Sequence, residues 1–405
     1  MVDSYFLSFF VFMALSGKKF FQHPKYIWLI WLGLSFINWW KEYFRDRYNN
    51  YKIFRQLFFH VLDKKNLYAG YPQEYFDSNH YGPVFAFIIA PFAILPDIWG
   101  SLLWSIFNAI VLYIAINRLP FKKDQLILIM LLCTIEMANA MWSNQFNSAA
   151  AAMIVLSFVL VEEKKDFQAS FFIVLGTLIK LYGIVGLVFF LFSKRKSVFI
   201  SGCVFWLVVM FLLPMLISSP EYIYHTYFDW FHSIVDKNQL NVSLDSSQDA
   251  SIMGIIRRVS GNENIRNFPI IITGLVLYLL PFLRFSQYKS KEYRLLILAS
   301  TLMFVILFSS SSEHPTYIYP MIGVSIWYIL QGEKMTTKLN LFLLAFVILI
   351  GGLGPTDILG YPVRRIVIDY SLKALPYAIV WLFILRELIV KEFQPMKVEP
   401  IMLKV

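Results

Sequence analysis

Residues 41–83 read KEYFRDRYNNYKIFRQLFFHVLDKKNLYAGYPQEYFDSNHYGP, a charged and aromatic stretch of the chain. Apolar runs flank it, the first ending in Trp39 and Trp40 and the second beginning at Tyr81. Inside the stretch, apolar residues recur at helical spacing: Phe54, Leu57, Phe58, Val61 and Leu62. This pattern predicts an amphipathic helix at the water interface, presented by a scaffold that the rest of the chain forms.

The composition of the whole chain is that of a membrane protein. Of the 405 residues, 58% are hydrophobic and only 15% are charged, whereas soluble domains carry roughly 25% charged residues. Apolar runs long enough to cross a hydrocarbon core of ~30 Å recur from end to end. We therefore predict an all-α fold, a polytopic helical membrane protein with about 11–12 spans. We expect one membrane domain, residues 1–405, with a first outer loop at 41–80 and a second at 218–267.

The net charge of +10 comes from short Lys and Arg clusters between apolar runs. This is the positive-inside pattern rather than a nucleic-acid footprint. We expect no nucleic-acid partner, contact with membrane lipids, and a multi-pass position in a cell membrane, the plasma membrane of a bacterium. The clusters place the polar connectors 144–147, 218–267 and 309–316 on the outer side together with residues 41–83.

Two parts of the topology stay open. Tyr5–Leu15 is apolar but short, which predicts an interfacial helix or an over-long start of the chain. If Tyr81–Pro96 and Trp99–Ile116 both cross the membrane, the basic segment Arg118–Lys123 falls on the outer side, against the charge pattern. Either one of these two runs or one of the next two is therefore expected to be re-entrant.

Two ionisable residues interrupt apolar runs, where a charge costs ~3 kcal/mol or more at the membrane centre. They are Glu136 and Lys180. Either they neutralise each other or reach an interface, or both line a water-filled cavity in which Lys180 pairs with a phosphate. Gln145 and Asn147 lie between two spans. A plain polar turn explains them, but their amides would also suit the hydroxyl groups of a sugar.

Arg257 and Arg258 end a short amphipathic run, where they contact lipid headgroups or, less simply, clamp a phosphate. Glu313 and His314 lie at the outer end of a span, and His314 is interpreted as a surface residue rather than a metal ligand. No GxxxxGK[ST], GxGxxG, HExxH or GxSxG motif occurs. The two cysteines lie in apolar runs without metal spacing. We expect no metal and no cofactor.

Several short elements follow one another along the chain: Asn50-Tyr51-Lys52-Ile53-Phe54, Lys65-Asn66-Leu67-Tyr68, Tyr81-Gly82-Pro83, Ala90-Pro91, Leu95-Pro96, Leu103-Trp104, Asn144-Gln145-Phe146-Asn147 and Ile179-Lys180-Leu181-Tyr182. Their order and spacing resemble those of glycosyltransferase family 87, over roughly residues 45–330. The resemblance implies the C-type membrane glycosyltransferase fold and a polyprenyl-phosphate sugar as donor. Many members of the family are mannosyltransferases. One small departure is Gly183, where the family usually has proline.

A larger departure from the family concerns the catalytic base. The resemblance implies a catalytic aspartate at the junction between the first span and the outer helix, and this chain has Asn50 at that position. Since an amide does not usefully accept a proton, another carboxylate of the stretch is expected to serve, Asp77 first and Asp46 second. The expected substrate-binding residues are Lys180, Gln145, Asn147, Asn50, Tyr81, Arg257, Arg258 and Glu313.

The leading hypothesis is an inverting glycosyltransferase that moves a hexose, mannose-like, from polyprenyl phosphate to a glycan or lipid acceptor on the outer face. Lys180 would stabilise the phosphate that leaves, with Arg257 or Arg258 in reserve. Two alternatives remain. One is a transporter or flippase of lipid-linked sugars, in which Glu136 and Lys180 are mid-membrane charges, although no repeated halves are found. The other is a non-catalytic member of the family, because of Asn50.

Overall fold

The computed structural model describes residues 24–394 except 245 and 247. The helix expected at Tyr5–Leu15 lies outside these residues. Every element in the described part is helical. The first half contains α2 (Pro24–Tyr43), α3 (Asn49–Leu62), α4 (Phe85–Ala93), α5 (Asp97–Asn117), α6 (Lys123–Trp142), α7 (Asn147–Glu162), α8 (Asp166–Lys180), η2 (Tyr182–Phe192), α9 (Lys196–Leu212) and η3 (Leu213–Leu216). The second half contains α10 (Pro220–Asn241), α11 (Ile252–Ser260), α12 (Asn267–Leu279), η4 (Leu280–Leu283), η5 (Phe285–Lys289), α13 (Lys291–Leu307), η6 (His314–Tyr317), α14 (Ile318–Leu330), η7 (Gly332–Thr336), α15 (Lys338–Phe346), η8 (Val347–Leu353), η9 (Asp357–Leu359), α16 (Tyr361–Asp369) and α17 (Ala374–Val390).

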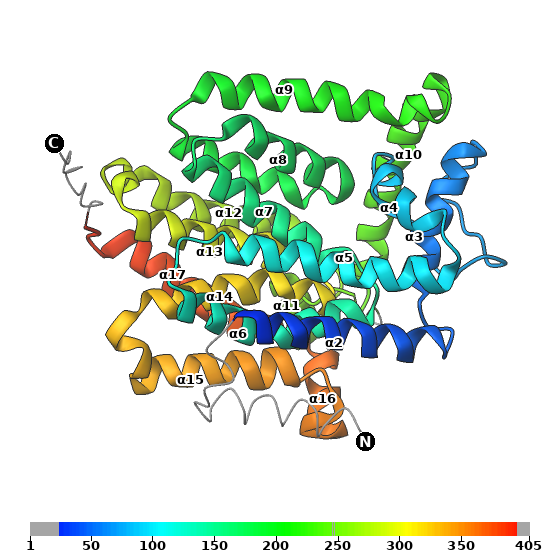
Figure 1. The fold of residues 1–405 in the computed structure, drawn as a ribbon. Helices are drawn as coiled ribbons and strands as arrows, with labels where there is room; N and C mark the ends of the chain where they lie inside the picture. The colour runs from blue at the N-terminus through cyan, green and yellow to red at the C-terminus, as the bar shows by residue number, and fades with distance from the viewer. Residues whose placement is uncertain (1–23, 245, 247, 395–405) are drawn as a thin grey trace.

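The long helices lie side by side, and the shorter polar elements gather at one end of the bundle. Helix α8 packs against α7 and α9, and α13 packs against α14 and α17. In Figure 1, α3, α4 and α10 stand together at the right-hand end of these long helices, and we call this the α3 end. The predicted all-α architecture of a helical membrane protein is confirmed.

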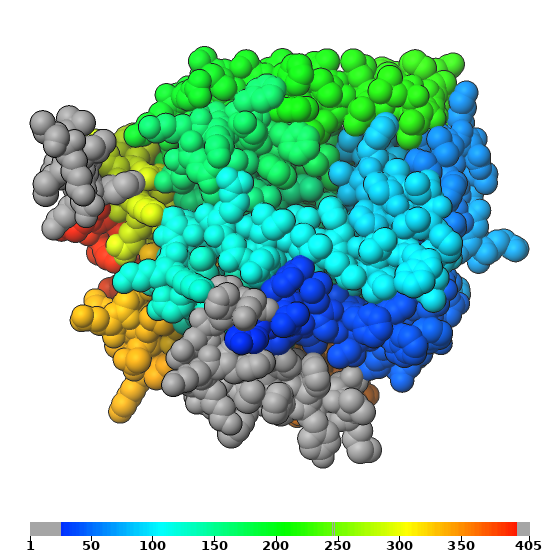
Figure 2. Space-filling model, viewed as in Figure 1, coloured from blue at the N-terminus to red at the C-terminus, as the bar shows by residue number. Residues whose placement is uncertain are grey.

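Three helical segments in the described part are long and apolar enough to cross a membrane: Asp97–Asn117, Lys123–Trp142 and Lys196–Leu216. The third, α9 with η3, forms one edge of the molecule in Figure 2. It exposes a series of apolar side chains there, as a lipid-facing helix does: Ile200, Val204, Phe205, Leu207, Val208 and Leu212. Other apolar helices of the described part are shorter, among them Asn267–Leu283 and Lys338–Leu353, in which α12 and α15 continue into η4 and η8. The count of 11–12 spans stays a prediction.

The geometry of α4 removes the topological conflict noted in the sequence. Phe85–Ala93 has 9 residues and is therefore ~14 Å long, about half of a hydrocarbon core. The chain turns at Leu95-Pro96 and continues as α5, which is long enough to cross. Arg118 at the far end of α5 pairs with Glu163 at 2.7 Å. The basic connectors after α5 and after α7 thus share the end of the bundle opposite the α3 end.

Glu136 has a partner other than Lys180. Its carboxylate lies 2.8 Å from the ammonium of Lys373 and accepts a hydrogen bond of 3.1 Å from the Tyr377 hydroxyl. The side chains of Glu136 and Lys373 are fully buried. The interpretation in which Glu136 and Lys180 neutralise each other is wrong, because the buried charge of α6 is compensated by the residue that precedes α17. Lys180 needs a separate account.

Helix α3 connects the polar stretch to the bundle. Its residues Phe54, Leu57 and Val61 are buried, and the helix packs against α4. The Asn49 side chain ties the beginning of α3 to the far end of the loop, because it donates to the Phe76 carbonyl at 2.7 Å and accepts from the Phe76 amide at 2.8 Å. The loop is therefore anchored at both ends rather than free in solvent.

The same loop touches α8 through a glycine. The Gly82 amide donates to the Ile179 carbonyl at 3.0 Å. A Cβ added at Gly82 would lie 1.9 Å from the Leu178 carbonyl oxygen, a backbone atom that cannot rotate away. Only glycine lets the loop backbone come this near to the last turn of α8.

We predict that Gly82→Ala lowers the free energy of unfolding by about 1–3 kcal/mol, because the two backbones must separate. The measurement is the midpoint of thermal unfolding of the purified protein in detergent. Gly70→Ala is the control, since a Cβ there meets nothing within 4 Å. Equal midpoints for the two variants would contradict the close packing of the loop on α8.

Candidate functional site

A chain of hydrogen bonds at the α3 end connects a cation to an anion through two amides. Lys180 donates from Nζ to Oδ1 of Asn147 at 2.8 Å. Asn147 donates from Nδ2 to Oε1 of Gln145, and Gln145 donates from Nε2 to Oε2 of Glu313 at 2.7 Å. Each amide turns its oxygen toward the ammonium and its nitrogen toward the carboxylate, so that the dipoles are aligned. Four predicted substrate-binding residues are therefore neighbours.

Two tyrosine rings flank the ammonium of Lys180. Its Nζ atom lies 5.6 Å from the ring centroid of Tyr81 and 5.3 Å from that of Tyr182. The Tyr182 hydroxyl bonds to Ser309 Oγ at 3.1 Å and to the Ser311 carbonyl at 3.2 Å. Aromatic faces attract a cation weakly. Among the described residues, Lys180 makes no direct ion pair with a carboxylate.

Two more polar groups beside this chain lack hydrogen-bond partners within the described part. The Tyr319 hydroxyl is fully buried, and its ring lies 5.8 Å from that of Tyr182. The Asn144 amide is buried as well, and both its oxygen and its nitrogen are unpaired in the described residues. Buried polar groups are nearly always hydrogen-bonded in folded proteins. These groups are therefore buried donors and acceptors without a partner among the described residues.

Some of the left-handed backbone conformations of the described residues lie in the same region. Asn144, Leu181 and Asp77 have positive φ angles of 50°, 56° and 69°. A left-handed conformation is uncommon for any residue other than glycine and costs most for a bulky one such as leucine. At Leu181 it ends α8 directly after Lys180 and turns the chain into η2. The left-handed Leu181 thus makes Lys180 the last residue of α8.

Asn50, at the place of the expected aspartate, lies beside the turn that carries Gln145. Its Nδ2 atom donates to the Ser143 carbonyl at 2.7 Å. A carboxylate could not donate this bond. Asn50 therefore fastens the beginning of α3 to the connector between α6 and α7.

The two expected bases lie at opposite ends of the polar stretch. Asp46 is 2.6 Å from Lys52, and its side chain is 75% exposed. Asp77 is 3.5 Å from Lys237 of α10 and 51% exposed, and its Oδ1 atom accepts from the Ser78 amide at 2.8 Å. Asp77 stands two residues before the buried Asn79 and four before Tyr81. Within the described part of the chain, the ion pair of Asp46 is to its own segment.

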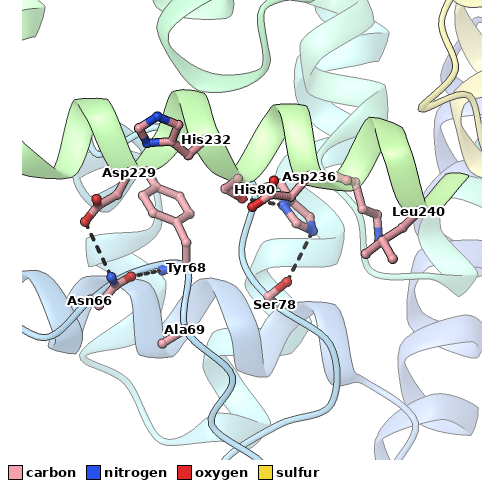
Figure 3. Close-up of a pocket in the computed structure, with 11 residues that line it drawn as sticks. Asn66, Tyr68, Ala69, Ser78, His80, Asp229, His232, Asp236 and Leu240 are labelled. Carbon is pink, nitrogen blue, oxygen red and sulfur yellow. Dashed lines mark hydrogen bonds between the residues drawn. The ribbon is translucent and has the colours of Figure 1, made fainter.

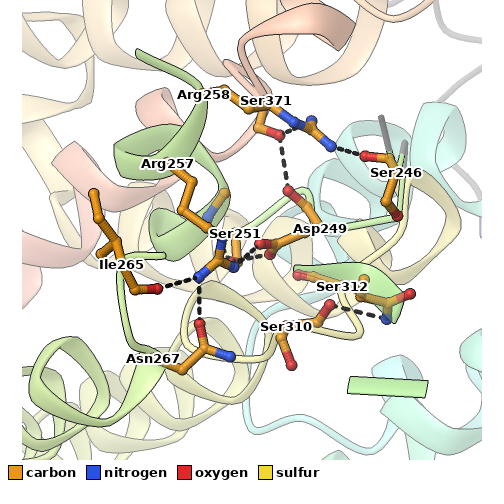
Figure 4. Close-up of polar contacts among 12 residues, drawn as sticks. Ser246, Asp249, Ser251, Arg257, Arg258, Ile265, Asn267, Ser310, Ser312 and Ser371 are labelled. Atoms are coloured by element: carbon orange, nitrogen blue, oxygen red, sulfur yellow. Dashed lines mark hydrogen bonds and ion pairs between the residues drawn. The ribbon is translucent and has the colours of Figure 1, made fainter. Parts of the chain in front are cut away.

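Arg257 and Arg258 form a separate cluster (Figure 4). Arg257 is 1% exposed and contacts Asp249, the Ile265 carbonyl at 3.2 Å and Asn267. Arg258 bonds to the Ile368 carbonyl at 3.1 Å and to Ser371 and Ser246. These contacts tie α11 to the segments around it. They occupy the guanidinium groups with partners from the chain itself, and none joins them to Lys180.

A cavity that the sequence did not indicate lies between the loop and α10 (Figure 3). Its volume is about 360 Å³. The lining residues are Asn66, Tyr68, Ala69, Ser78, His80, Asp229, His232, Ser233, Asp236, Lys237 and Leu240. One pattern in the sequence could have indicated it, because six of the lining residues recur at helical spacing and so share one face of a helix. They are Asp229, His232, Ser233, Asp236, Lys237 and Leu240. The described residues hold no group of three His, Cys, Asp or Glu side chains suited to a metal ion.

His80 lines this cavity and precedes Tyr81, the residue whose ring lies beside Lys180. Its Nδ1 atom is 2.7 Å from Ser233 Oγ, and its Nε2 atom is 3.3 Å from Ser78 Oγ. Burial, with a smaller effect of Lys237, lowers the pKa of His80 from 6.5 to about 4. The imidazole is consequently neutral at physiological pH. The next residue along the chain is Tyr81, whose ring faces Lys180.

The pKa of His80 predicts a stability that depends on pH. The unfolded chain takes up this proton near pH 6.5 and the folded chain near pH 4, so stability falls as the pH drops between these values, by about 3 kcal/mol at most. His80→Gln, which can still bond to the two serines, should lose less stability than the wild type. The measurement is the thermal unfolding midpoint at pH 7.5 and pH 5. An identical pH dependence of the two proteins would contradict the assignment.

Comparison with known proteins gives a family match for this chain. No curated protein matches the chain. Residues 79–310, more than half of the sequence, match glycosyltransferase family 87, and the matched segment contains Lys180, Asn147, Gln145 and the cavity wall of α10. Membership of this family implies membrane glycosyltransferase activity, with a sugar donor and an acceptor as substrates. The chain belongs to glycosyltransferase family 87.

Proposed function

We propose that this protein transfers a hexose, mannose-like, from a polyprenyl-phosphate donor to a glycan or lipid acceptor. The α3 end of the bundle would face the outside of a bacterial plasma membrane, in which the chain is a multi-pass protein. The donor's lipid tail would lie among the helices, with its phosphate at Lys180.

The observation that carries this proposal is the ammonium of Lys180. Its hydrogen bond goes to a neutral amide oxygen at 2.8 Å, and Glu313 lies two amides away. A positive charge held apart from any carboxylate leaves room for an anionic ligand. The phosphate of a lipid-linked sugar has the charge and the oxygen acceptors that such a cation requires.

The same position suits the chemistry. The acceptor hydroxyl attacks the anomeric carbon while a carboxylate takes its proton, and a new carbon–oxygen bond forms with inversion. The bond from the anomeric carbon to the phosphate oxygen breaks, and its electron pair stays on the phosphate. Lys180 stabilises the charge that develops there. Gln145 and Asn147 would bond to sugar hydroxyls, and the ring of Tyr81 would border the sugar.

Asp77 is the favoured base, ahead of Asp46. It lies on the segment that leads to Tyr81 and beside Lys237 of the cavity wall. Asp46 pairs with Lys52 and is largely exposed. Asn50 holds the beginning of α3 near the site through Ser143. Arg257 and Arg258 remain as reserves for the phosphate, although their contacts within the chain make Lys180 the better choice.

Lys180→Gln tests the cation. Glutamine can still donate to Asn147, but the charge is lost, so transfer from polyprenyl-phosphate mannose should fall at least a hundredfold. The thermal unfolding midpoint should stay equal or rise, because a charge without a direct counter-ion has been removed. The assay follows radiolabelled mannose in purified membranes. Retained transfer would remove Lys180 from the mechanism, and a marked loss of stability would make its role structural.

Asp77→Asn tests the base. Asparagine accepts the hydrogen bond of the Ser78 amide and tolerates a positive φ angle, so expression and folding should be intact while transfer falls at least a hundredfold. Asp46→Asn is the matched variant and should lose far less activity. Unchanged transfer by Asp77→Asn would exclude Asp77 as the base. A wild-type protein that neither transfers nor hydrolyses any polyprenyl-phosphate sugar would contradict the proposed function itself.

A further inference from the structure

The cavity between α10 and the loop presents polar groups that no neighbour occupies (Figure 3). Within the described part of the chain, the Asp236 carboxylate makes no hydrogen bond or ion pair, and neither does the His232 imidazole. Asp229 accepts only a long bond of 3.4 Å from Asn66. Free carboxylates on the wall of a cavity can accept hydrogen bonds from a ligand.

The charge of this wall distinguishes between classes of ligand. Asp229 and Asp236 are two anions, and Lys237 is the one cation among the lining residues. Lys237 already lies 3.5 Å from Asp77. This balance disfavours a phosphate. It favours a neutral ligand rich in hydroxyl groups, because a carboxylate accepts bonds from two adjacent hydroxyls and these charge-assisted bonds are strong.

The size and the aromatic part of the cavity fit a sugar. A volume of about 360 Å³ is at the small end of the range for ligand sites. Tyr68 adds an aromatic ring, held in place because its hydroxyl donates to the Tyr81 carbonyl at 3.2 Å. A ring of this kind packs against the apolar face of a hexose.

Two connections bring the cavity to the site of transfer. His80 lines the cavity and is followed by Tyr81, whose ring centroid is 5.6 Å from Lys180 Nζ. On the other side, Ser78 lines the cavity and is preceded by Asp77, the favoured base. The lining residues Ser78 and His80 are therefore the direct chain neighbours of the favoured base and of the ring beside the cation that would hold the donor.

Helix α10 places the cavity at the membrane surface. Its polar face lines the cavity, whereas other positions expose apolar side chains at helical spacing: Tyr224, Phe228, Phe231 and Val235. Exposed aromatic residues on an amphipathic helix are typical of the membrane interface. A ligand of this cavity is thus within reach of a sugar headgroup on a lipid of the same membrane.

We propose that this cavity binds the sugar headgroup of a membrane-anchored acceptor, with Asp229 and Asp236 accepting hydrogen bonds from its hydroxyl groups. The proposal rests on the proposed transferase function and adds the class of the acceptor. It predicts that short alkyl hexosides bind here in the absence of any donor.

The test uses the full chain in lipid nanodiscs with hexyl α-mannoside, hexyl β-glucoside and hexyl β-galactoside as probes. At least one should slow amide hydrogen exchange in 66–80 and 229–240. The double variant Asp229→Asn/Asp236→Asn should bind that probe at least tenfold more weakly, with unchanged exchange when no probe is present. Asp63→Asn is the control, because Asp63 is an exposed carboxylate of the same loop outside the cavity. Absence of protection by all three probes, or equal protection in the double variant, would overturn the proposal.

Methyl glycosides of the same sugars separate two sources of the headgroup. Tighter binding of the hexyl compound supports a lipid acceptor, whereas equal affinity would overturn the membrane-anchored part and assign a water-soluble glycan. Consumption of the donor by the wild type, measured as transfer and hydrolysis together in membranes that contain acceptors, decides the proposed function independently. A protein that binds hexosides but leaves the donor intact would contradict the transferase function alone, and an active protein without hexoside binding would contradict the cavity alone.

Discussion

A single charge, the ammonium of Lys180, determines how the α3 end is organised. Two side-chain amides, of Asn147 and Gln145, separate it from the Glu313 carboxylate at the other end of the hydrogen-bond chain. Each amide is oriented by the residue to which it bonds. The arrangement requires the connectors after α6 and α13 and the last turn of α8 to meet within hydrogen-bond distance. A polar network inside a low-dielectric region is stable only when its members are hydrogen-bonded. This network therefore links the positions of the ends of α6, α8 and α13.

The remaining polar elements at this end are fixed to that centre. Asn50 connects α3 to the turn before Asn147, and Tyr182 connects the beginning of η2 to the serines after α13. Asn241 of α10 donates to the Ser310 carbonyl at 3.1 Å. Asn50, where the resemblance to the family implies an aspartate, thus ties two connectors together. Under the proposed function, the carboxylates that act on the substrates lie further out, on the loop and on α10.

Much of the architecture was predictable because it depends on local patterns. Apolar runs and basic clusters gave the helical membrane class, and the spacing of Phe54, Leu57 and Val61 gave α3. The alignment of Gln145, Asn147, Lys180 and Glu313 at one end followed from counting connectors. Contacts between residues distant in sequence were not predictable. The residues around Glu136 do not show that its partner is Lys373. The cavity forms between two segments about 150 residues apart in the chain, which the hydrogen bond between His80 and Ser233 connects.

The buried pair of Glu136 and Lys373 has a consequence for biosynthesis. Its members are 237 residues apart in the chain, so α6 leaves the ribosome long before its counter-charge exists. Until the segment before α17 arrives, Glu136 lacks the cation that compensates it in the folded bundle, and an ionisable group without a partner is costly in lipid. Completion of the bundle therefore awaits the C-terminal segment, and a chain that stops before it would retain an unneutralised acid in its centre.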